Sequence, residues 1–123
     1  MAKVLVVDDE PLTVEMLSVF LKMIGHDTVS AFSGRQTWDR LAYEEPDAVL
    51  LDIMLPDDNG LDICRRMRAE EKTRTVPIIM ISAHSPKMDR EAAEVGATGY
   101  LQKPIRLPDL KSALESAGIR QGG

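Results

Sequence analysis

Five polar side chains of this sequence lie at or just after the end of an apolar run. Asp8 and Asp9 follow VLVV, and Asp52 closes the run AVLLD. Ser82 follows PIIMI, and Lys103 comes shortly after GYL. Clustered carboxylates suit a hard divalent cation such as Mg²⁺, which keeps several waters and takes one or two carboxylates. A carboxylate can also attack phosphorus to form an aspartyl phosphate, while a metal, a lysine and a hydroxyl neutralise the transferred oxygens. Together these residue types could bind a metal ion and handle a phosphoryl group.

The apolar runs have the length of β-strands, and helical patterns separate them. We expect strands at residues 4–7, 28–31, 48–51, 77–81 and 99–101. Apolar residues recur at helical spacing over residues 14–24, 38–41, 61–67, 88–95 and 107–117. Strands that alternate with helices predict an α/β fold, with a parallel sheet covered by helices on both faces. In such a sheet the ligand crevice lies at the carboxyl ends of the strands, where the strand order reverses. The polar side chains described above should therefore meet in one crevice.

The size and charge of the chain limit its class. Its 123 residues, 44% of them hydrophobic and 28% charged, fit one globular domain. The formal net charge of -5 disfavours direct nucleic-acid binding, which needs a basic face. No apolar run approaches the roughly 18 residues of a membrane span, and the start of the chain does not resemble a signal peptide. The single cysteine, Cys64, cannot form an internal disulfide, and its helical pattern predicts a small buried side chain. We therefore expect a cytoplasmic protein that does not bind membranes.

The motifs around these residues resemble those of the receiver domains of two-component response regulators. VDDE, LLDIMLPDDNG, ISA and GYLQKP occur in the family's order and spacing, and the likeness spans residues 3 to about 117. The resemblance implies a flavodoxin-like, doubly wound (βα)5 fold with a five-stranded parallel sheet in the order 2-1-3-4-5. Residues 1–118 would form the receiver domain, and residues 119–123 a short tail or the start of a linker.

The resemblance also implies a role for each acidic residue of the site. Asp52 would be the phospho-acceptor and a member of the metal site. Asp9 would bind Mg²⁺, or Mn²⁺ in its place, directly, and Asp8 would act on the ion through water. The backbone carbonyl of Met54 would be a further metal ligand.

Three more residues would act on the phosphoryl group or respond to it. Ser82 would bind the group through its hydroxyl, with Lys103 as the cationic partner. Tyr100 would swing inward when Ser82 is pulled toward the phosphate. The resemblance also implies a cis bond between Lys103 and Pro104, because such a bond aims the lysine into the crevice.

The side chains of Met54 and His84 would flank the path of the water that hydrolyses the aspartyl phosphate. Met54 is apolar, so it can obstruct this water but cannot orient it. His84 either contacts the phosphoryl group or the water, with a pH-dependent effect, or is merely exposed at the rim. Both residues are therefore candidates for tuning the lifetime of the phosphorylated state.

Other polar residues fit structural roles. Asp57 and Asp58 fit a turn and a helix cap better than a metal site. His26 follows the end of a helix, where we expect it to be exposed. Glu10 fits the first turn of a helix, because the helix dipole favours an acid there. Residues 65–74, which are rich in arginine and glutamate, fit a solvated charged face.

The leading hypothesis is a phosphorylation-activated signalling switch rather than an enzyme that acts on other substrates. A histidine kinase or a histidine phosphotransfer protein would donate the phosphoryl group, and the surface around Tyr100 would control an output domain or partner protein. The alternative is a metal-dependent phosphohydrolase with an aspartyl nucleophile, but such enzymes usually carry D-x-D after the first strand and add a cap domain. A phosphorylation-independent interaction module would not need the intact set of site residues. A flavin-binding protein of similar topology needs a hydroxyl-rich phosphate loop where this chain is acidic.

Overall fold

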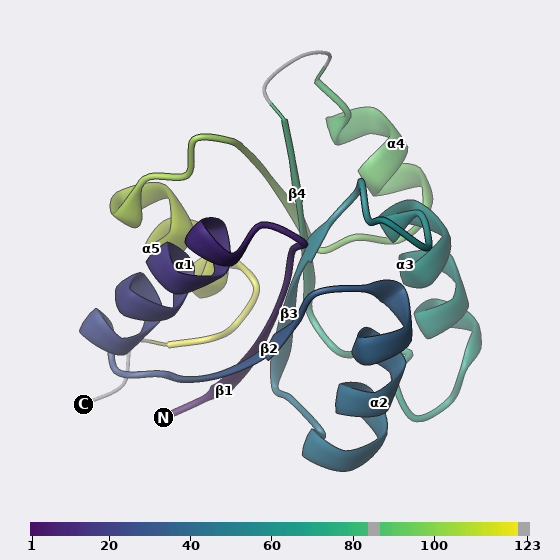
Figure 1. Ribbon diagram of the computed structural model, residues 1–123, viewed down its shortest axis with the longest axis horizontal. Helices are drawn as coiled ribbons and strands as arrows, with labels where there is room; N and C mark the ends of the chain where they lie inside the picture. The colour runs from purple at the N-terminus through teal and green to yellow at the C-terminus, as the bar shows by residue number, and fades with distance from the viewer. Residues whose placement is uncertain (84–86, 121–123) are drawn as a thin grey trace.

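In the computed structural model, which describes residues 1–83 and 87–120, a five-stranded sheet lies between two layers of helices (Figure 1). The strands are β1 (Lys3–Val7), β2 (Asp27–Ala31), β3 (Ala48–Asp52), β4 (Ile78–Ser82) and β5 (Gly99–Gln102). The helices are α1 (Pro11–Met23), α2 (Gly34–Glu44), α3 (Gly60–Ala69), α4 (Asp89–Glu94) and α5 (Leu107–Ser116). All neighbouring strands pair in parallel, in the order β2-β1-β3-β4-β5, which confirms the predicted α/β fold and strand order. Figure 1 shows α1 and α5 on one face of the sheet and α2, α3 and α4 on the other.

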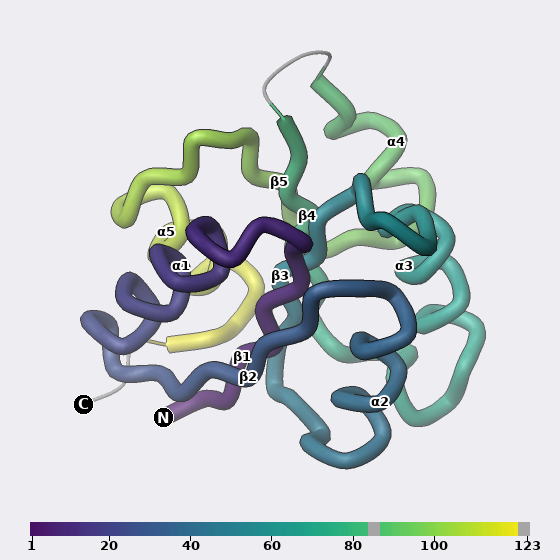
Figure 2. Tube along the Cα trace, in the orientation of Figure 1, coloured from purple at the N-terminus to yellow at the C-terminus, as the bar shows by residue number. Residues whose placement is uncertain are grey.

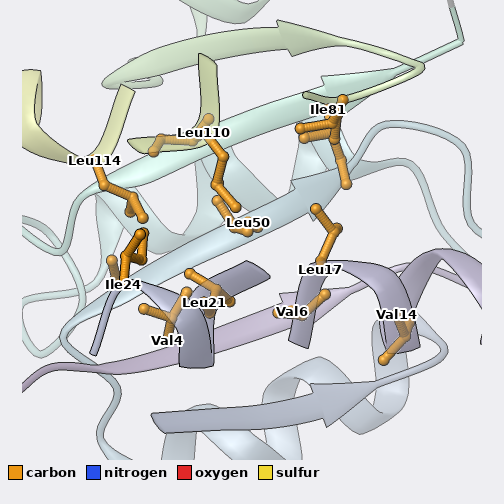
Figure 3. Close-up of a cluster of buried hydrophobic side chains, with 13 residues drawn as sticks. Val4, Val6, Val14, Leu17, Leu21, Ile24, Leu50, Ile81, Leu110 and Leu114 are labelled. Carbon is orange, nitrogen blue, oxygen red and sulfur yellow. The ribbon is translucent and has the colours of Figure 1, made fainter. Parts of the chain in front are cut away.

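Each face of the sheet has its own hydrophobic cluster, because successive side chains of a strand point to opposite faces. Val4 and Val6 of β1 belong to the cluster under α1 and α5, whereas Leu5 and Val7 belong to the cluster on the other face. Figure 3 shows the first cluster, in which side chains of α1 and α5 meet those of the central strands. All residues of β3 and β4 are buried, so the residues at the carboxyl ends of these strands have a firm support.

The helices begin and end at residues whose chemistry explains the boundary. Pro11 opens α1, where its missing N–H costs nothing. The Ser33 hydroxyl accepts a hydrogen bond from the Gln36 amide at the start of α2, and the Asn59 side chain accepts one from the Leu61 amide at the start of α3. A glycine with a positive φ angle follows each of three helices: Gly25 (φ 86°), Gly96 (φ 90°) and Gly118 (φ 91°). None of the described helices has the length and apolar character that crossing a membrane requires.

The carboxyl ends of the strands gather at one edge of the sheet. Figure 2 shows the loops after β1, β3 and β5 leaving this edge beside the end of β4. Backbone hydrogen bonds of the sheet continue one residue beyond β1, β3 and β5, and the Ile53 amide after β3 donates to the Ile81 carbonyl at 3.0 Å. The Asp8 amide donates to the Ala31 carbonyl at 3.1 Å, and the Lys103 amide donates to the Ser82 carbonyl at 2.8 Å. The residues just past the strand ends are therefore held as firmly as the strands themselves.

The expectation that His26 is exposed was wrong, because only 3% of its surface is accessible. After Gly25 the chain turns directly into β2, and this turn places the imidazole beneath the start of the chain. His26 Nδ1 accepts a hydrogen bond from the Ala2 amide at 3.2 Å. Burial, followed by the charge of the amino terminus, lowers the pKa of His26. Cys64, by contrast, is buried as expected.

Candidate functional site

Four strands deliver the predicted site residues to one edge of the sheet. Asp8 directly follows β1, and Asp52 is the last residue of β3. Ser82 is the last residue of β4, and Lys103 directly follows β5. The chain continues from β1 to β2 on one side, while β3 lies on the other side of β1, so the strand order reverses here. The site therefore lies where ligands bind in open α/β sheets.

Three carboxylates meet at this reversal point. One oxygen each from Asp8, Asp9 and Asp52 lies within 4.8 Å of the others. Asp8 is fully buried and Asp52 is 4% exposed, whereas Asp9 faces solvent. The Glu10 amide donates to Asp8 Oδ1 at 2.9 Å, and this bond fixes the orientation of the Asp8 side chain. The predicted acidic cluster is thus formed by side chains that the fold holds close together.

The Lys103 ammonium reaches into this cluster. Its Nζ lies 2.7 Å from Asp8 Oδ2, 3.4 Å from Asp52 Oδ2 and 3.3 Å from Glu10 Oε1. The peptide bond between Lys103 and Pro104 is cis, as the family resemblance implied. Burial would lower the pKa of Lys103, but the surrounding carboxylates outweigh burial and raise it to about 12. The lysine therefore stays charged wherever the site can work.

Asp52 is costly to ionise in this setting. Burial and the negative charge of Asp8 raise the pKa of Asp52 to about 6, against the weaker opposing effects of Lys103 and of the Met54 amide. The Met54 amide donates to Asp52 Oδ1 at 3.2 Å. One ammonium is thus too little positive charge for the carboxylates around it, and a further cation would relieve their repulsion.

The donor set fits a hard divalent cation. Asp8 Oδ2 is buried, and the Lys103 ammonium lies 2.7 Å from it. Asp8, Asp9 and Asp52 each offer one carboxylate oxygen, and these oxygens are close enough together to surround one ion, directly or through water. Oxygen-only ligands and incomplete enclosure, with room for water, suit Mg²⁺.

A chain of hydrogen bonds leads from Ser82 to the start of α4. The Ser82 hydroxyl donates to the Ala83 carbonyl at 3.1 Å, which leaves its oxygen to accept from the Tyr100 hydroxyl at 2.5 Å. The Tyr100 oxygen in turn accepts from the Met88 amide at 2.9 Å. Tyr100 therefore already points inward in this structure and joins the site to α4.

The two residues predicted to tune hydrolysis differ in what the structure describes. Met54 is 69% exposed, directly beyond the end of β3, so its side chain stands at the rim of the site. The roles of its side chain in hydrolysis and of its carbonyl as a metal ligand stay predictions. His84 lies outside the described residues, so its role stays a prediction as well.

Two acidic residues contribute more than the sequence indicated. Glu10 is the N-cap residue of α1, and its carboxylate makes no capping hydrogen bond but contacts Lys103. Asp57 does cap a helix, but this helix is the distant α2 and not the adjacent α3. The position of Glu10 directly after the acidic pair was a usable signal. Nothing in the sequence marks the partner of Asp57, because it lies 23 residues away.

Comparisons with known proteins agree on one family. The chain matches the family model of the response regulator receiver domain over residues 4–115. It is similar to the chemotaxis protein CheY4 of Vibrio cholerae, with 30% identity, a TM-score of 0.86, and coverage of 95% of this chain and 98% of that one. A receiver domain protein from Clostridium thermocellum has 28% identity and a TM-score of 0.86, with 95% and 94% of the two chains covered. A receiver domain of a sensor histidine kinase from Pseudomonas aeruginosa, described with a magnesium ion coordinated in its active site cleft, has 29% identity and a TM-score of 0.84 over 95% and 98% of the chains.

The chain therefore belongs to the response regulator receiver domain family. It is a regulatory domain of the two-component signalling class, and the family resemblance seen in the sequence is confirmed. Receiver domains of this family bind Mg²⁺ in an acidic pocket, and this chain has an acidic cluster in the corresponding crevice.

Proposed function

We propose that this chain is a phosphorylation-activated switch that accepts a phosphoryl group on Asp52 from the phosphohistidine of a sensor kinase or a phosphotransfer protein. The observation that carries the proposal is the setting of Asp52. It is a buried carboxylate whose repulsion by Asp8 is only partly offset by Lys103, and it belongs to the acidic cluster at the carboxyl ends of the strands.

The side chains divide the transfer chemistry among them. An oxygen of ionised Asp52 attacks phosphorus, the P–N bond of the phosphohistidine breaks, and its electron pair stays with the imidazole of the donor. Lys103 and the Ser82 hydroxyl neutralise the phosphoryl oxygens. Asp8, Asp9, Asp52 and the Met54 carbonyl would hold Mg²⁺, or Mn²⁺ in its place, and the ion would supply the charge that lets the carboxylates and the phosphoryl group share one site. The domain promotes only its own phosphorylation and dephosphorylation.

The response to phosphorylation starts at Ser82. When its hydroxyl turns from the Ala83 carbonyl to the phosphoryl oxygens, the oxygen that holds the Tyr100 hydroxyl moves with it. The Tyr100 hydroxyl oxygen also accepts a hydrogen bond from the amide of Met88, the N-cap residue of α4, so a shift of Ser82 reaches α4. We place the contact with the output partner on this Tyr100 face, where Lys87, Asp89 and Leu101 line a shallow hollow beside it.

The donor has to cover the rim of the site in order to present its histidine to Asp52. α1 begins beside this rim, and it exposes a stripe of apolar side chains, Leu12 (80% exposed), Val19 (53%) and Met23 (64%). These residues recur at helical spacing and lie on one face of α1. We assign this stripe to the donor because it is continuous with the edge that carries Glu10 and Asp8. The cytoplasmic location and the absence of direct nucleic-acid binding stay predictions.

The test is covalent labelling with a small phosphoryl donor. The full chain is incubated with acetyl phosphate and Mg²⁺, and intact mass is measured for the parent, for Asp52→Asn and for Asp62→Asn. Asp62 is an exposed acid of α3 paired with Arg65, so it controls for the lost charge. The proposal expects one phosphoryl group on the parent and the control and none on Asp52→Asn. Labelling that persists in Asp52→Asn would show that another residue is the acceptor. Sustained release of phosphate from a phosphomonoester would favour the phosphohydrolase instead.

A further inference from the structure

The segment of residues 53–59, called here the β3–α3 loop, is closed tightly at its base. The Gly60 amide donates to the Ile53 carbonyl at 2.7 Å, and Met54 and Asn59 form an antiparallel bridge. A Cβ at position 60 would lie 2.2 Å from the Asp52 carbonyl oxygen, so α3 starts directly against the end of β3 only because residue 60 is glycine. The base of the loop therefore follows the position of Asp52.

The tip of the same loop is fastened to a different helix. Asp57 Oδ1 accepts from the Gly34 amide at 2.7 Å, and Asp57 Oδ2 accepts from the Arg35 amide at 3.1 Å. These are the first amides of α2, which lack partners within their own helix. The Gly34 amide, followed by the Arg35 amide, lowers the pKa of Asp57, so the carboxylate stays ionised over the working range of pH. An exposed acid thus joins the loop after Asp52 to the N-terminus of α2.

A second contact holds the loop from the neighbouring position. A Cβ at Gly34 would lie 2.7 Å from Asp58 Cβ, so the loop and α2 touch directly. Asp58 Oδ2 accepts from Arg66 of α3 at 2.6 Å, and the Arg66 guanidinium lies 5.0 Å from the centre of the Trp38 ring of α2. Both acidic residues of the loop tip are therefore tied to the helices that flank it.

Met54 belongs to the closed base of the loop, beside Asp52. Its amide donates to Asp52 Oδ1, so the backbone at residue 54 and the Asp52 carboxylate are held in one arrangement. We propose that Asp57 is a positioning residue of the site: by clamping the β3–α3 loop to α2, it holds the backbone of Met54 against Asp52 and so sets the affinity for Mg²⁺. This inference rests on the proposed function of the Asp52 site and goes beyond it by assigning a task to Asp57.

The experiment measures the Mg²⁺ dependence of labelling by acetyl phosphate for the parent, Asp57→Ala and Asp57→Asn, with Asp62→Ala as the control for a lost exposed acid. Asp57→Ala should raise the Mg²⁺ concentration at half-maximal rate about 3- to 10-fold, less than the ~10–100-fold of a group that touches a metal ligand directly. The rate at saturating Mg²⁺ should stay within about 2-fold, because the reacting groups are untouched. Asp57→Asn should fall between the parent and Asp57→Ala, because one of the two oxygens that accept from the α2 amides becomes an NH2 group, which cannot accept.

Direct Mg²⁺ titration of the unphosphorylated chain, followed by amide NMR signals, separates the two proposals. Loss of the low-field shift of the Gly34 amide in Asp57→Ala shows that the clamp is open, and the remaining signals show that the fold is intact. A parent that is never labelled overturns the proposed function, while the titration still tests Asp57. A Mg²⁺ dissociation constant for Asp57→Ala equal to those of the parent and of Asp62→Ala overturns the inference. If Asp57→Ala does not fold, the same comparison with Asp57→Asn decides it.

Discussion

Two positively charged side chains, Lys103 and Arg68, are surrounded by oxygen atoms at opposite ends of the sheet. The partners of Lys103 are charged, whereas those of Arg68 are neutral. At the carboxyl ends of the strands, Lys103 lies within 3.4 Å of oxygens from three carboxylates. At the amino ends of β4 and β5, Arg68 of α3 donates to four backbone carbonyls and one hydroxyl. These belong to Gly96 (2.8 Å), Thr73 (3.3 Å), Arg74 (3.0 Å), Val76 (2.8 Å) and Thr98 (3.3 Å).

The difference distinguishes a structural junction from the proposed ligand site. The Arg68 junction pairs one charge with neutral dipoles, so its hydrogen bonds are satisfied without repulsion and nothing further is needed there. At the Lys103 end, Asp8, Asp9, Glu10 and Asp52 outnumber one ammonium, and the raised pKa of Asp52 records the excess of negative charge. That excess costs stability until a cation enters the site.

Removing the arginine should have the largest effect on stability. Arg68→Ala leaves several carbonyls at the α3–β4 and α4–β5 connections without their donor and should lower the free energy of unfolding by about 3 kcal/mol. Arg65→Ala, which breaks only an exposed pair with Asp62, should cost less than about 0.5 kcal/mol. Urea unfolding of both variants checks this, and equal losses would mean that the Arg68 junction is not a structural anchor.

At the other end of the sheet, removing a charge should raise the free energy of unfolding rather than lower it. The pKa of Asp52 is raised from 3.8 to about 6 in the folded chain, so the folded state holds this proton more tightly than the unfolded state. Stability should therefore fall as pH rises from about 4 to about 6, and the charge should cost about 3 kcal/mol at pH 7 without Mg²⁺. Asp52→Asn should recover this amount and should flatten that part of the pH profile, whereas Asp62→Asn should not. A destabilised Asp52→Asn variant would contradict the account of excess charge.

The stabilisation of the fold by Mg²⁺ should depend on the acidic cluster and not on the Arg68 junction. At a concentration ten times the dissociation constant, an ion that binds only the folded state adds about 1.4 kcal/mol to the free energy of unfolding. Asp9→Ala should lose this gain, and Arg68→Ala should keep it in full although its baseline is lower. Thermal unfolding with and without Mg²⁺ measures both, and an unchanged gain in Asp9→Ala would remove Asp9 from the metal site.

The smallest effect is expected at the rim. Met54→Asn replaces an exposed apolar side chain by a donor and acceptor that can orient water next to the acyl phosphate. Decay of the phosphorylated chain after removal of the donor should become a few-fold faster at constant Mg²⁺, with little change in stability. If the Asn variant decays no faster than the parent, residue 54 does not control the water.

The sequence predicted the fold, and the edge of the sheet at which the candidate site residues meet, for a physical reason. Apolar runs that alternate with helical patterns leave few arrangements of a parallel sheet, and Asp8, Asp52 and Ser82 stand directly at strand ends, where position along the chain determines position in space. The same logic fails where a partner is remote. Asp57 bonds to α2, and nothing near Asp57 in the sequence marks that helix start as its neighbour.

The Arg68 junction shows a second limit. Arg68 lies in a segment that was interpreted as a solvated charged face, and for Arg65, which is paired only with Asp62 at the surface, that interpretation fits. The partners of Arg68 are backbone carbonyls, which every sequence contains, so composition cannot mark them. The burial of His26 was missed for a similar reason, since its partner is the backbone amide of Ala2.

The most direct test of the account locates the phosphoryl group itself. The full chain is treated with acetyl phosphate in the presence or absence of Mg²⁺, aspartyl phosphates are reduced with borohydride to homoserine, and peptides are sequenced by mass spectrometry. We expect homoserine at position 52 only, and only when Mg²⁺ is present. Homoserine at position 8 or 9, or equal labelling of Asp52 without the metal, would contradict it.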